Sequence, residues 1–263
     1  MGGTKFMIGF WRLVTGAAVA LAVSTSIPQS ALAQVKVMTS GGFAAPLREM
    51  LPEFQKSSGL SVEVIPGKSQ GTDPATISAQ LIRGVAADIV ILSREGLNDL
   101  AAANRIVAHS DIDVAKTPLG LAVRAGAPKP DISTVEGFKK ALLQAKSITY
   151  PSSTTGIYMA TQLFPRLGIA DAVIPKSSNA GIAAVAKGEA EIAIQPVSEL
   201  LHVPGTDFVG TLPKEIQYIS VFSAARVAGS DKGADAAKLM TFLGSAKARE
   251  AIRNSGMEPL PSH

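Results

Sequence analysis

Cysteine is absent from this 263-residue sequence, tryptophan occurs once, and aromatic residues make up only 5% of the chain. Without cysteine there is no disulfide framework, so a hydrophobic core has to hold the folded protein together. Small disulfide-stapled scaffolds are thereby excluded. The scarcity of aromatic side chains also argues against a flat platform on which sugar rings stack.

Charged residues are few, at 17% of the chain, and the net charge of +4 comes from interspersed residues of both signs. No basic run interleaved with aromatics suggests a nucleic-acid partner. The three histidines, His109, His202 and His263, are too far apart in sequence to indicate a metal site. The G-x-S-x-G nucleophile elbow and the phosphate-binding P-loop are both missing. We therefore expect no metal, no cofactor and no nucleic acid, and a monomer that binds a small molecule.

The first 33 residues have the layout of a secretory signal peptide. Lys5 and Arg12 precede an apolar run at residues 13–23, and a polar stretch then ends in an Ala-Leu-Ala tripeptide. The run is shorter than the roughly 20 apolar residues that cross a bilayer, which disfavours the alternative of a retained membrane anchor. We predict cleavage after Ala33 and a mature chain, beginning at Gln34, that is free in the bacterial periplasm.

Short β-branched runs alternate with helical patterns after residue 34. The predicted strands are 35–39, 60–65, 87–92, 119–124, 147–150, 172–174, 190–195 and 216–227. The predicted helices are 43–57, 74–83, 95–103, 135–145, 155–167, 178–187, 198–202, 232–243 and 246–254. Such alternation is typical of the α/β class, in which parallel sheets are covered by helices on both faces.

Two extended stretches, near 117–124 and 218–227, divide this series in two. We therefore expect a two-lobed α/β protein in which these stretches are the hinge crossings. Residues 34–117 and 227–263 would form lobe 1, and residues 118–226 would form lobe 2. Ligands of open α/β sheets collect outside the carboxyl ends of the strands, which predicts a ligand site in a cleft between the lobes.

Small polar residues follow predicted strands in both lobes. They are Ser40, Gly41 and Gly42 in lobe 1 and Ser153, Thr154 and Thr155 in lobe 2. Glycine lets the backbone approach a ligand, and the free amides at a helix start attract anions. Ser and Thr are also the commonest helix caps, so each segment alone has an ordinary structural explanation. Their corresponding places in the two lobes favour a binding site.

The loop after the second predicted strand adds a cation and three side chains that can form hydrogen bonds. These residues are Lys68, Ser69, Gln70 and Thr72. Gln195 is a further candidate, because it ends an otherwise apolar strand and buried amides are normally paired. Arg226 in the second crossing is another possible cation. Glu199 and His202 are predicted to be surface residues rather than an acid–base pair.

Three stretches of the sequence are similar to a known family. They read VKVMTSGGFAAPLREMLPEFQKSSG, SQGTDPATISAQLIRGVAADIVILS and, near the end, AAKLMTFLGSAKAREAIRNSGMEP. Over nearly all of residues 35–260 the chain resembles the periplasmic molybdate-binding proteins and the wider group of solute-binding proteins of ATP-driven importers. This resemblance implies the type II periplasmic binding fold, with two α/β lobes, two crossover strands and closure around an oxyanion.

The molybdate ligands of that family do not carry over to this sequence. By alignment, the two ligand serines of the family fall on Gly42 and Gln70, and its ligand tyrosine falls on Pro196. Lys68 would instead bring a full positive charge, and a hydrogen bond between charged groups is worth about 1.5–3 kcal/mol. A small organic di- or tricarboxylate is therefore a better expectation than molybdate.

Three functions remain open. The missing catalytic motifs favour a receptor that delivers a carboxylate to a membrane permease. The chain would belong to a divergent branch of the family, which aconitate isomerase resembles in size and secretion. That periplasmic enzyme moves a proton between cis- and trans-aconitate. On that hypothesis Lys68 would be a base or a carboxylate anchor and Tyr158 would be the acid. A sensor subunit that presents its closed form to a signalling partner rests only on the flexibility of two-lobed folds.

Protein recovered from the periplasm of an expressing bacterium should begin at Gln34, because signal peptidase cuts after small residues at positions −3 and −1. The intact mass of the purified protein measures this directly. A mass that includes Met1 or Leu13 contradicts the prediction.

Overall fold

The computed structural model of the protein describes residues 1–2 and 34–261, and the predicted signal peptide lies outside the described residues. The strands are β1 (Gln34–Ser40), β2 (Ser61–Gly67), β3 (Ile89–Ser93), β4 (Ile112–Arg124), β5 (Ile148–Thr149), β6 (Ser177–Ser178), β7 (Ile192–Pro196), β8 (Thr206–Thr211), β9 (Ile219–Arg226) and β10 (Glu258–Pro259). The α-helices are α1 (Gly41–Ser58), α2 (Ile77–Ile82), α3 (Arg94–Ala102), α4 (Val135–Gln144), α5 (Thr154–Tyr158), α6 (Phe164–Arg166), α7 (Ala170–Val173), α8 (Ile182–Lys187), α9 (Val197–Leu200), α10 (Gly233–Leu243) and α11 (Ala246–Asn254).

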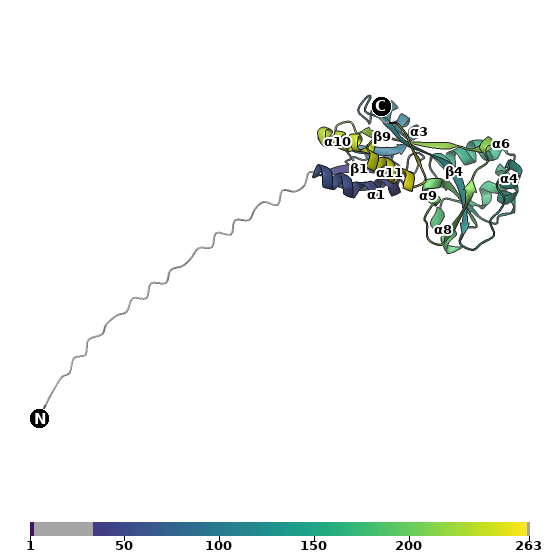
Figure 1. Ribbon diagram of the computed structural model, residues 1–263, viewed down its shortest axis with the longest axis horizontal. Coiled ribbons are helices and arrows are strands. Elements are labelled where there is room, and N and C mark those ends of the chain that lie inside the picture. Colours follow the sequence, from purple (N-terminus) through teal and green to yellow (C-terminus); the bar gives the residue numbers. More distant parts are fainter. Residues whose placement is uncertain (3–33, 262–263) are drawn as a thin grey trace. The chain divides into compact units, whose positions relative to one another are not determined.

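The strands form two groups, each with a parallel part. In the first group β2, β1 and β3 are parallel neighbours, and β9 lies antiparallel beside β3. In the second group β6, β5 and β7 are parallel neighbours, and β4 lies antiparallel beside β7. Figure 1 shows α1, α10 and α11 around the first group and α4, α6 and α8 around the second. This is the predicted two-lobed α/β architecture.

Strand β4 joins the two groups because it changes partners along its length. Residues 112–118 pair with β9, whereas residues 119–124 pair with β7 and β8. Strand β9 brings the chain back and pairs with β3 and with the first half of β4. The two crossings expected from the sequence therefore meet as an antiparallel pair at Thr117 and Pro118, and the pairing extends back along β4 to Ile112.

Two details of this arrangement differ from the sequence-based expectations. The sheets are mixed rather than wholly parallel, because both crossing strands run antiparallel to their neighbours. The predicted boundary at residue 226 also places β9 in lobe 2, whereas residues 222–226 of β9 pair with β3 of the first group. The return to that group thus occurs by Phe222.

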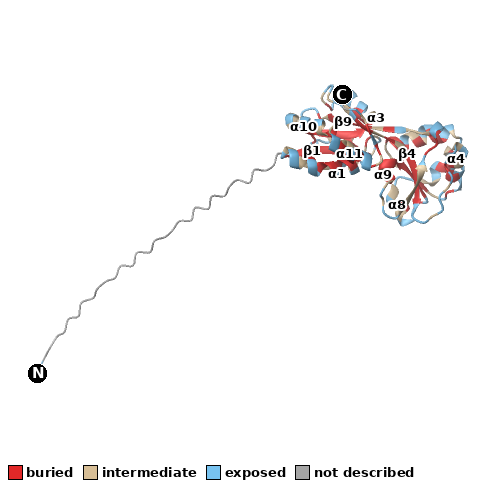
Figure 2. Ribbon diagram, viewed as in Figure 1, coloured by how far each residue is buried: buried red, intermediate tan, exposed pale blue. Residues whose placement is uncertain are grey.

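Each group of strands is buried on both faces. In the first group, Phe54 and Leu239 belong to the core that α1 and α10 cover, and Leu97 of α3 belongs to the core on the other face. In the second group, Phe138 and Val185 belong to separate cores in the same way. Figure 2 shows the buried segments running along the strands with exposed helix faces outside them. Such double-sided burial gives each lobe a rigid frame for its loops.

Local sequence signals set many helix ends correctly. Gly59 ends α1 in the left-handed conformation, with φ of 70°, and the Thr134 side chain caps α4. The strand predicted at 172–174 is wrong, since these residues lie in α7 and the 3₁₀ turn Ile174–Lys176. A three-residue apolar run has no periodicity that separates strand from helix. Strand β8 was not predicted, because its half-buried TDFVGT segment lacks the apolar alternation of a typical strand.

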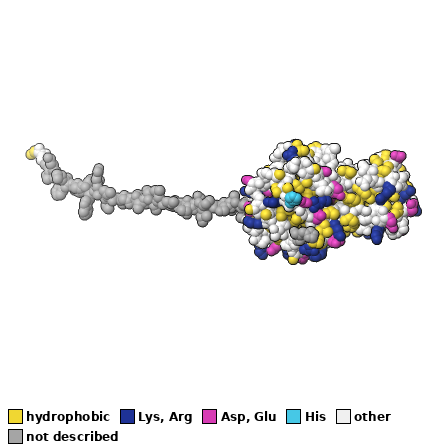
Figure 3. Space-filling view, turned by 90° about the horizontal axis from the view of Figure 1, so that it is seen from above, with side chains coloured by type: hydrophobic (Ala, Val, Ile, Leu, Met, Phe, Trp, Pro, Cys, Tyr) yellow, Lys and Arg dark blue, Asp and Glu magenta, His cyan; other side chains and the backbone are white. Residues whose placement is uncertain are grey.

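The described residues include no helix long and apolar enough to cross a membrane. On the face seen in Figure 3, Lys and Arg side chains are interspersed with Asp and Glu side chains, as the sequence composition suggests.

Replacing Leu239 by alanine should lower the free energy of unfolding by about 2–5 kcal/mol, because this fully buried side chain fills the core between α10 and the sheet. The change Ile82→Ala is the matched control, since 64% of Ile82 is exposed, and we expect a change within about 0.5 kcal/mol. Urea denaturation measures both values. Equal effects of the two substitutions would show that the core is assigned incorrectly.

Candidate functional site

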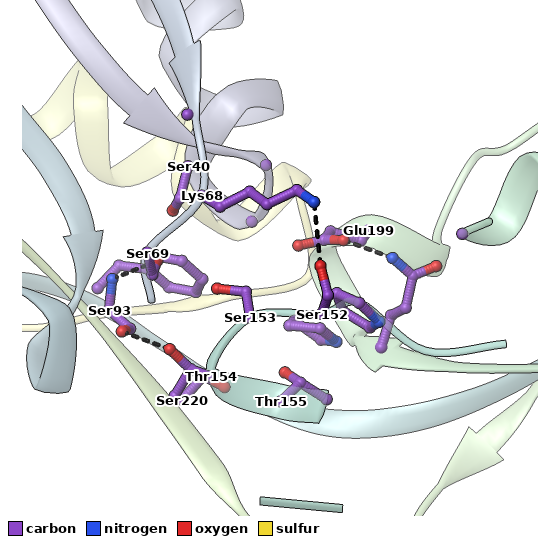
Figure 4. Close-up of a pocket in the computed structure, with 18 of the residues that line it drawn as sticks. Ser40, Lys68, Ser69, Ser93, Ser152, Ser153, Thr154, Thr155, Glu199 and Ser220 are labelled. Atoms are coloured by element: carbon purple, nitrogen blue, oxygen red, sulfur yellow. Dashed lines mark hydrogen bonds between the residues drawn. The ribbon is translucent and has the colours of Figure 1, made fainter. Parts of the chain in front are cut away.

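The carboxyl ends of strands from both lobes surround one pocket of about 210 Å³ (Figure 4). This volume is below the roughly 300–1,000 Å³ of sites for drug-sized ligands, so the pocket suits a small metabolite. Its lining residues are Ser40, Gly41, Gly42, Gly67, Lys68, Ser69 and Ser93 on one side, Pro151, Ser152, Ser153, Thr154, Thr155, Asn179, Gly181, Gln195, Pro196 and Glu199 on the other, and Ser220 and Phe222 from β9.

Ser40 occupies the N-cap position of α1 but does not cap the helix. Its side chain makes no capping hydrogen bond, and its buried Oγ has no partner among the described residues. The side chains of Thr76, Ser93 and Thr134 do accept hydrogen bonds from the amides of the helices that they precede. The hydroxyl of Ser40 is therefore available to a ligand in the pocket.

The opposite wall contains a second serine of this kind. Ser153 precedes α5 without capping it, and its Oγ instead accepts a hydrogen bond of 3.1 Å from the backbone amide of Gln70. Helix α5 continues through a π-helical turn, Met159–Leu163, into α6. Neither Ser40 nor Ser153 therefore caps the helix that it precedes. Ser153 instead forms a hydrogen bond with the facing lobe.

Lys68 extends across the pocket from the end of β2. Its ammonium nitrogen Nζ lies 2.5 Å from Asp73 Oδ2 and donates to Ser152 Oγ at 3.0 Å. The same hydrogen bond from Lys68 holds the pKa of the Asp73 carboxyl below its usual range. Since an ammonium carries three donor hydrogens, one remains for a ligand. These contacts suit an anchor for an anion.

A hydrogen-bonded chain closes the pocket beside Lys68. The Ser93 and Thr154 hydroxyl oxygens are 2.8 Å apart, and Thr154 donates to Gln70 Oε1 at 3.0 Å. The buried Ser69 hydroxyl accepts from the Ser93 amide at 2.9 Å and fixes the loop against β3. Gly96, at the start of α3, has no room for a side chain, because a Cβ would lie 2.3 Å from the Ser69 carbonyl oxygen. The loop at 67–72 therefore faces the other lobe.

Gln195 and Glu199 form a polar pair in the second wall. Gln195 Nε2 donates to Glu199 Oε2 at 2.6 Å, while the buried Gln195 Oε1 has no partner among the described residues. Burial raises the pKa of Glu199 to about 7, and the hydrogen bond from Gln195 opposes that rise. A carboxyl that titrates near neutral pH can both accept and donate a proton under physiological conditions.

The geometry can now be compared with known proteins. A family model described as bacterial extracellular solute-binding protein matches residues 35–258. The chain belongs to this family. Members bind small solutes outside the bacterial cytoplasm, so membership agrees with export to the periplasm, whereas cleavage after Ala33 concerns residues that the structure does not describe.

Individual known proteins are similar to this chain over most of its length. The sequence is 34% identical over 259 residues to an aconitate isomerase from Pseudomonas sp, covering 96% of this chain and 99% of that protein. The Azotobacter vinelandii periplasmic molybdate-binding protein has a similar structure, with a TM-score of 0.66 and 18% identity over 87% of this chain and 100% of that one. A periplasmic thiamin-binding protein has a TM-score of 0.67 and 16% identity over 88% and 84%. The structural matches show the two-lobed periplasmic-binding-protein fold.

The structure brings most of the predicted site residues together. Ser40, Gly41, Gly42, Lys68, Ser69, Ser153, Thr154, Thr155 and Gln195 all line the pocket. Gln70 does not line it but supports its wall through Thr154, and Thr72 is exposed on the loop.

Two other predicted residues lie elsewhere. Tyr158 stacks on Tyr218, with ring centroids 4.7 Å apart, and its hydroxyl donates to the Ile216 carbonyl, so it does not line the pocket as an acid. Arg226 pairs in register with Ile89 at the end of β3 opposite Ser93, so it does not supply a second cation.

The prediction that Glu199 is a surface residue is wrong, because the residue is half-buried and its carboxyl is desolvated in the pocket wall, whereas His202 is exposed as expected. Glu199 lies in the four-residue helix α9, which is too short to show a buried face in sequence. The only signal is its position directly after the buried strand that ends in Gln195 and Pro196. Ser152 and Ser93 follow strands as well, and their contacts come from the facing lobe.

No group of three or more His, Cys, Asp or Glu side chains that could hold a metal ion occurs in the part of the chain that the structure describes. The pocket offers hydroxyls, one ammonium, one amide and one carboxyl. This set can bind an organic anion and move a proton.

Glu199 should make the folded protein less stable as pH rises. Its pKa is about 7 in the folded state and about 4.5 in the unfolded chain, so the folded state binds more protons between these values and stability is lost through this window. Relative to Glu199→Gln, the wild type should lose about 2 kcal/mol of unfolding free energy between pH 5 and pH 8. Urea denaturation at both pH values measures the difference. Parallel pH profiles of the two proteins would contradict the burial of Glu199.

Proposed function

We propose that this protein is a periplasmic isomerase that interconverts cis- and trans-aconitate by moving an allylic proton. The observation that carries the proposal is a single small pocket that combines donors for carboxylates with a carboxyl group that titrates near neutral pH. A receptor needs only the donors. A nearby carboxylate repels an anionic ligand, so its presence favours a site that also handles a proton.

The donors support a small di- or tricarboxylate as ligand. The Lys68 ammonium and the hydroxyls of Ser40, Ser152 and Thr155 face the same space from different elements (Figure 4). Charge-assisted hydrogen bonds of this kind favour carboxylates. Several separate donors suit an acid with more than one carboxylate.

The pocket also disfavours molybdate. A Cβ on Gly42 would lie 2.2 Å from Cζ of Phe222, so a ligand serine at this place does not fit without moving the ring. The positions that match the molybdate ligands of the family carry Gly42, Gln70 and Pro196, none of which has a hydroxyl.

The similarity to an aconitate isomerase over nearly the whole of both chains supports the choice of substrate. The second candidate is a solute receptor that delivers a carboxylate to a membrane permease, as expected for the solute-binding family as a whole. The unpartnered Ser40 hydroxyl would serve either function. The isomerase and the receptor differ only in whether the protein transfers a proton to and from the bound acid.

Purified mature protein should convert trans-aconitate into cis-aconitate, and chromatography of the reaction mixture measures both acids. Calorimetry on the same preparation measures binding. Binding of aconitate without interconversion would support the receptor and contradict the isomerase, and absence of both would contradict a carboxylate site altogether.

Replacing Lys68 by methionine should lower kcat/KM about 10- to 100-fold, mainly through KM, because one charge-assisted hydrogen bond to a carboxylate is lost. Lys36→Met is the matched control, since Lys36 lies on β1 in an exposed pair with Glu63 and should not affect activity. A large fall in kcat with unchanged KM would contradict the role of Lys68 as an anchor.

A further inference from the structure

We propose that Glu199 is the catalytic residue that removes and returns the substrate proton, and that Gln195 is its positioning residue. This inference rests on the proposed isomerase function. It concerns the carboxyl of α9, which the sequence pattern alone places on the surface.

The two oxygens of the Glu199 carboxyl have different surroundings. Oε2 accepts the 2.6 Å hydrogen bond from Gln195, whereas Oε1 faces the start of α1. A Cβ added to Gly41 would lie 3.5 Å from Oε1, and one added to Gly42 would lie 3.2 Å from it. The missing side chain of Gly41 therefore leaves the space beside Oε1 open to a ligand, whereas the Phe222 ring fills the space at Gly42.

Space rather than backbone conformation accounts for glycine at position 41. Neither Gly41 nor Gly42 has a positive φ, so neither backbone needs glycine for its conformation. A side chain at Gly41 would make only ordinary contacts with its surroundings, but it would cover Oε1. Gly41 thus keeps the carboxyl accessible at the point where α1 offers its free amides to an anion.

The position of Glu199 is fixed from two sides. Gln195 is 5% exposed and belongs to β7, so its amide comes from a rigid strand. On the other side, the Ser198 hydroxyl donates to the Gly42 carbonyl at 3.0 Å and ties α9 to α1. A carboxyl held in this way loses little further orientational freedom when it approaches a substrate carbon.

The charged surroundings of Glu199 are sparse. Lys68 is the other ionisable residue that lines the pocket. The elements packed against α9 carry Arg48, Glu49, Glu53 and Lys56 on α1, Asp113, Lys116 and Arg124 on β4, and Asp207 on β8. Burial raises the pKa of Glu199, and the hydrogen bond from Gln195 lowers it. No charged neighbour contributes to the shift of this pKa. Its proton affinity is thus governed by desolvation and by Gln195.

The reaction step balances without any other reactant. Oε1 of the ionised Glu199 takes a proton from the methylene carbon of aconitate, and the C–H electron pair forms a new double bond to the central carbon. The electron pair of the old double bond forms a C–H bond at the far carbon with a proton returned by the Glu199 carboxylic acid. The carboxylate is regenerated and the product is the geometric isomer. Lys68 holds one substrate carboxylate in place through both proton transfers.

The substitution Glu199→Gln should lower kcat at least 100-fold, the lower range of general acid–base catalysis, while trans-aconitate still binds. The exposed Glu189→Gln is the matched control and should keep full activity. Calorimetry measures binding by each variant, and circular dichroism measures its fold. If the wild type isomerises aconitate and Glu199→Gln does as well, this assignment is wrong. If the wild type itself is inactive, the proposed isomerase function fails first.

Two further variants separate catalysis from structure. In wild type, kcat/KM should rise with pH through about 7 as Glu199 ionises, and Gln195→Leu should move this limb to higher pH because it removes the hydrogen bond that lowers the Glu199 pKa. Gly41→Ala should fold normally but lower kcat, because its methyl group covers Oε1. An unmoved limb in Gln195→Leu would contradict the positioning role, and full activity in Gly41→Ala would contradict approach at Oε1.

Discussion

The antiparallel pairing of β4 with β9 is the constraint on which the rest of this protein depends. Strand β4 pairs with β9 up to Pro118 and with β7 and β8 from Leu119 onward, so one continuous strand belongs to both groups. This places the ends of β1, β2 and β3 opposite the ends of β5 and β7. Side chains far apart in sequence, such as Lys68 and Ser152, come within hydrogen-bond distance for this reason.

The pocket contains buried polar atoms that have no hydrogen-bond partner among the described residues, which is uncommon in protein interiors. Ser40 Oγ and Gln195 Oε1 are buried without partners among the described residues, and each such group costs about 1–3 kcal/mol. The buried cores on both faces of each sheet offset this cost. A ligand that forms hydrogen bonds with these atoms recovers this energy, which favours the binding of a polar ligand.

In the proposed function, a binding scaffold also carries out acid–base chemistry. A solute-binding family supplies two walls of hydroxyls and amides, and this chain places a desolvated carboxyl among them. Glycine at positions 41 and 42 makes room for the carboxyl and for the Phe222 ring, and Gln195 holds the carboxyl in place.

The sequence by itself determined the alternation of strands and helices, the two crossings and about half of the pocket lining, because hydrophobic periodicity and the residues after each strand are local properties. It identified Lys68, Ser40 and Gln195 through their places at strand ends. Only the tertiary structure decided which serines cap helices and which face a ligand, since Ser40 and Ser93 have similar local settings but different partners. It also decided the surroundings of Glu199, because desolvation of a carboxyl depends on elements that pack around it from distant parts of the chain. The direction of Tyr158 and the antiparallel crossings were settled in the same way, by contacts that no local pattern encodes.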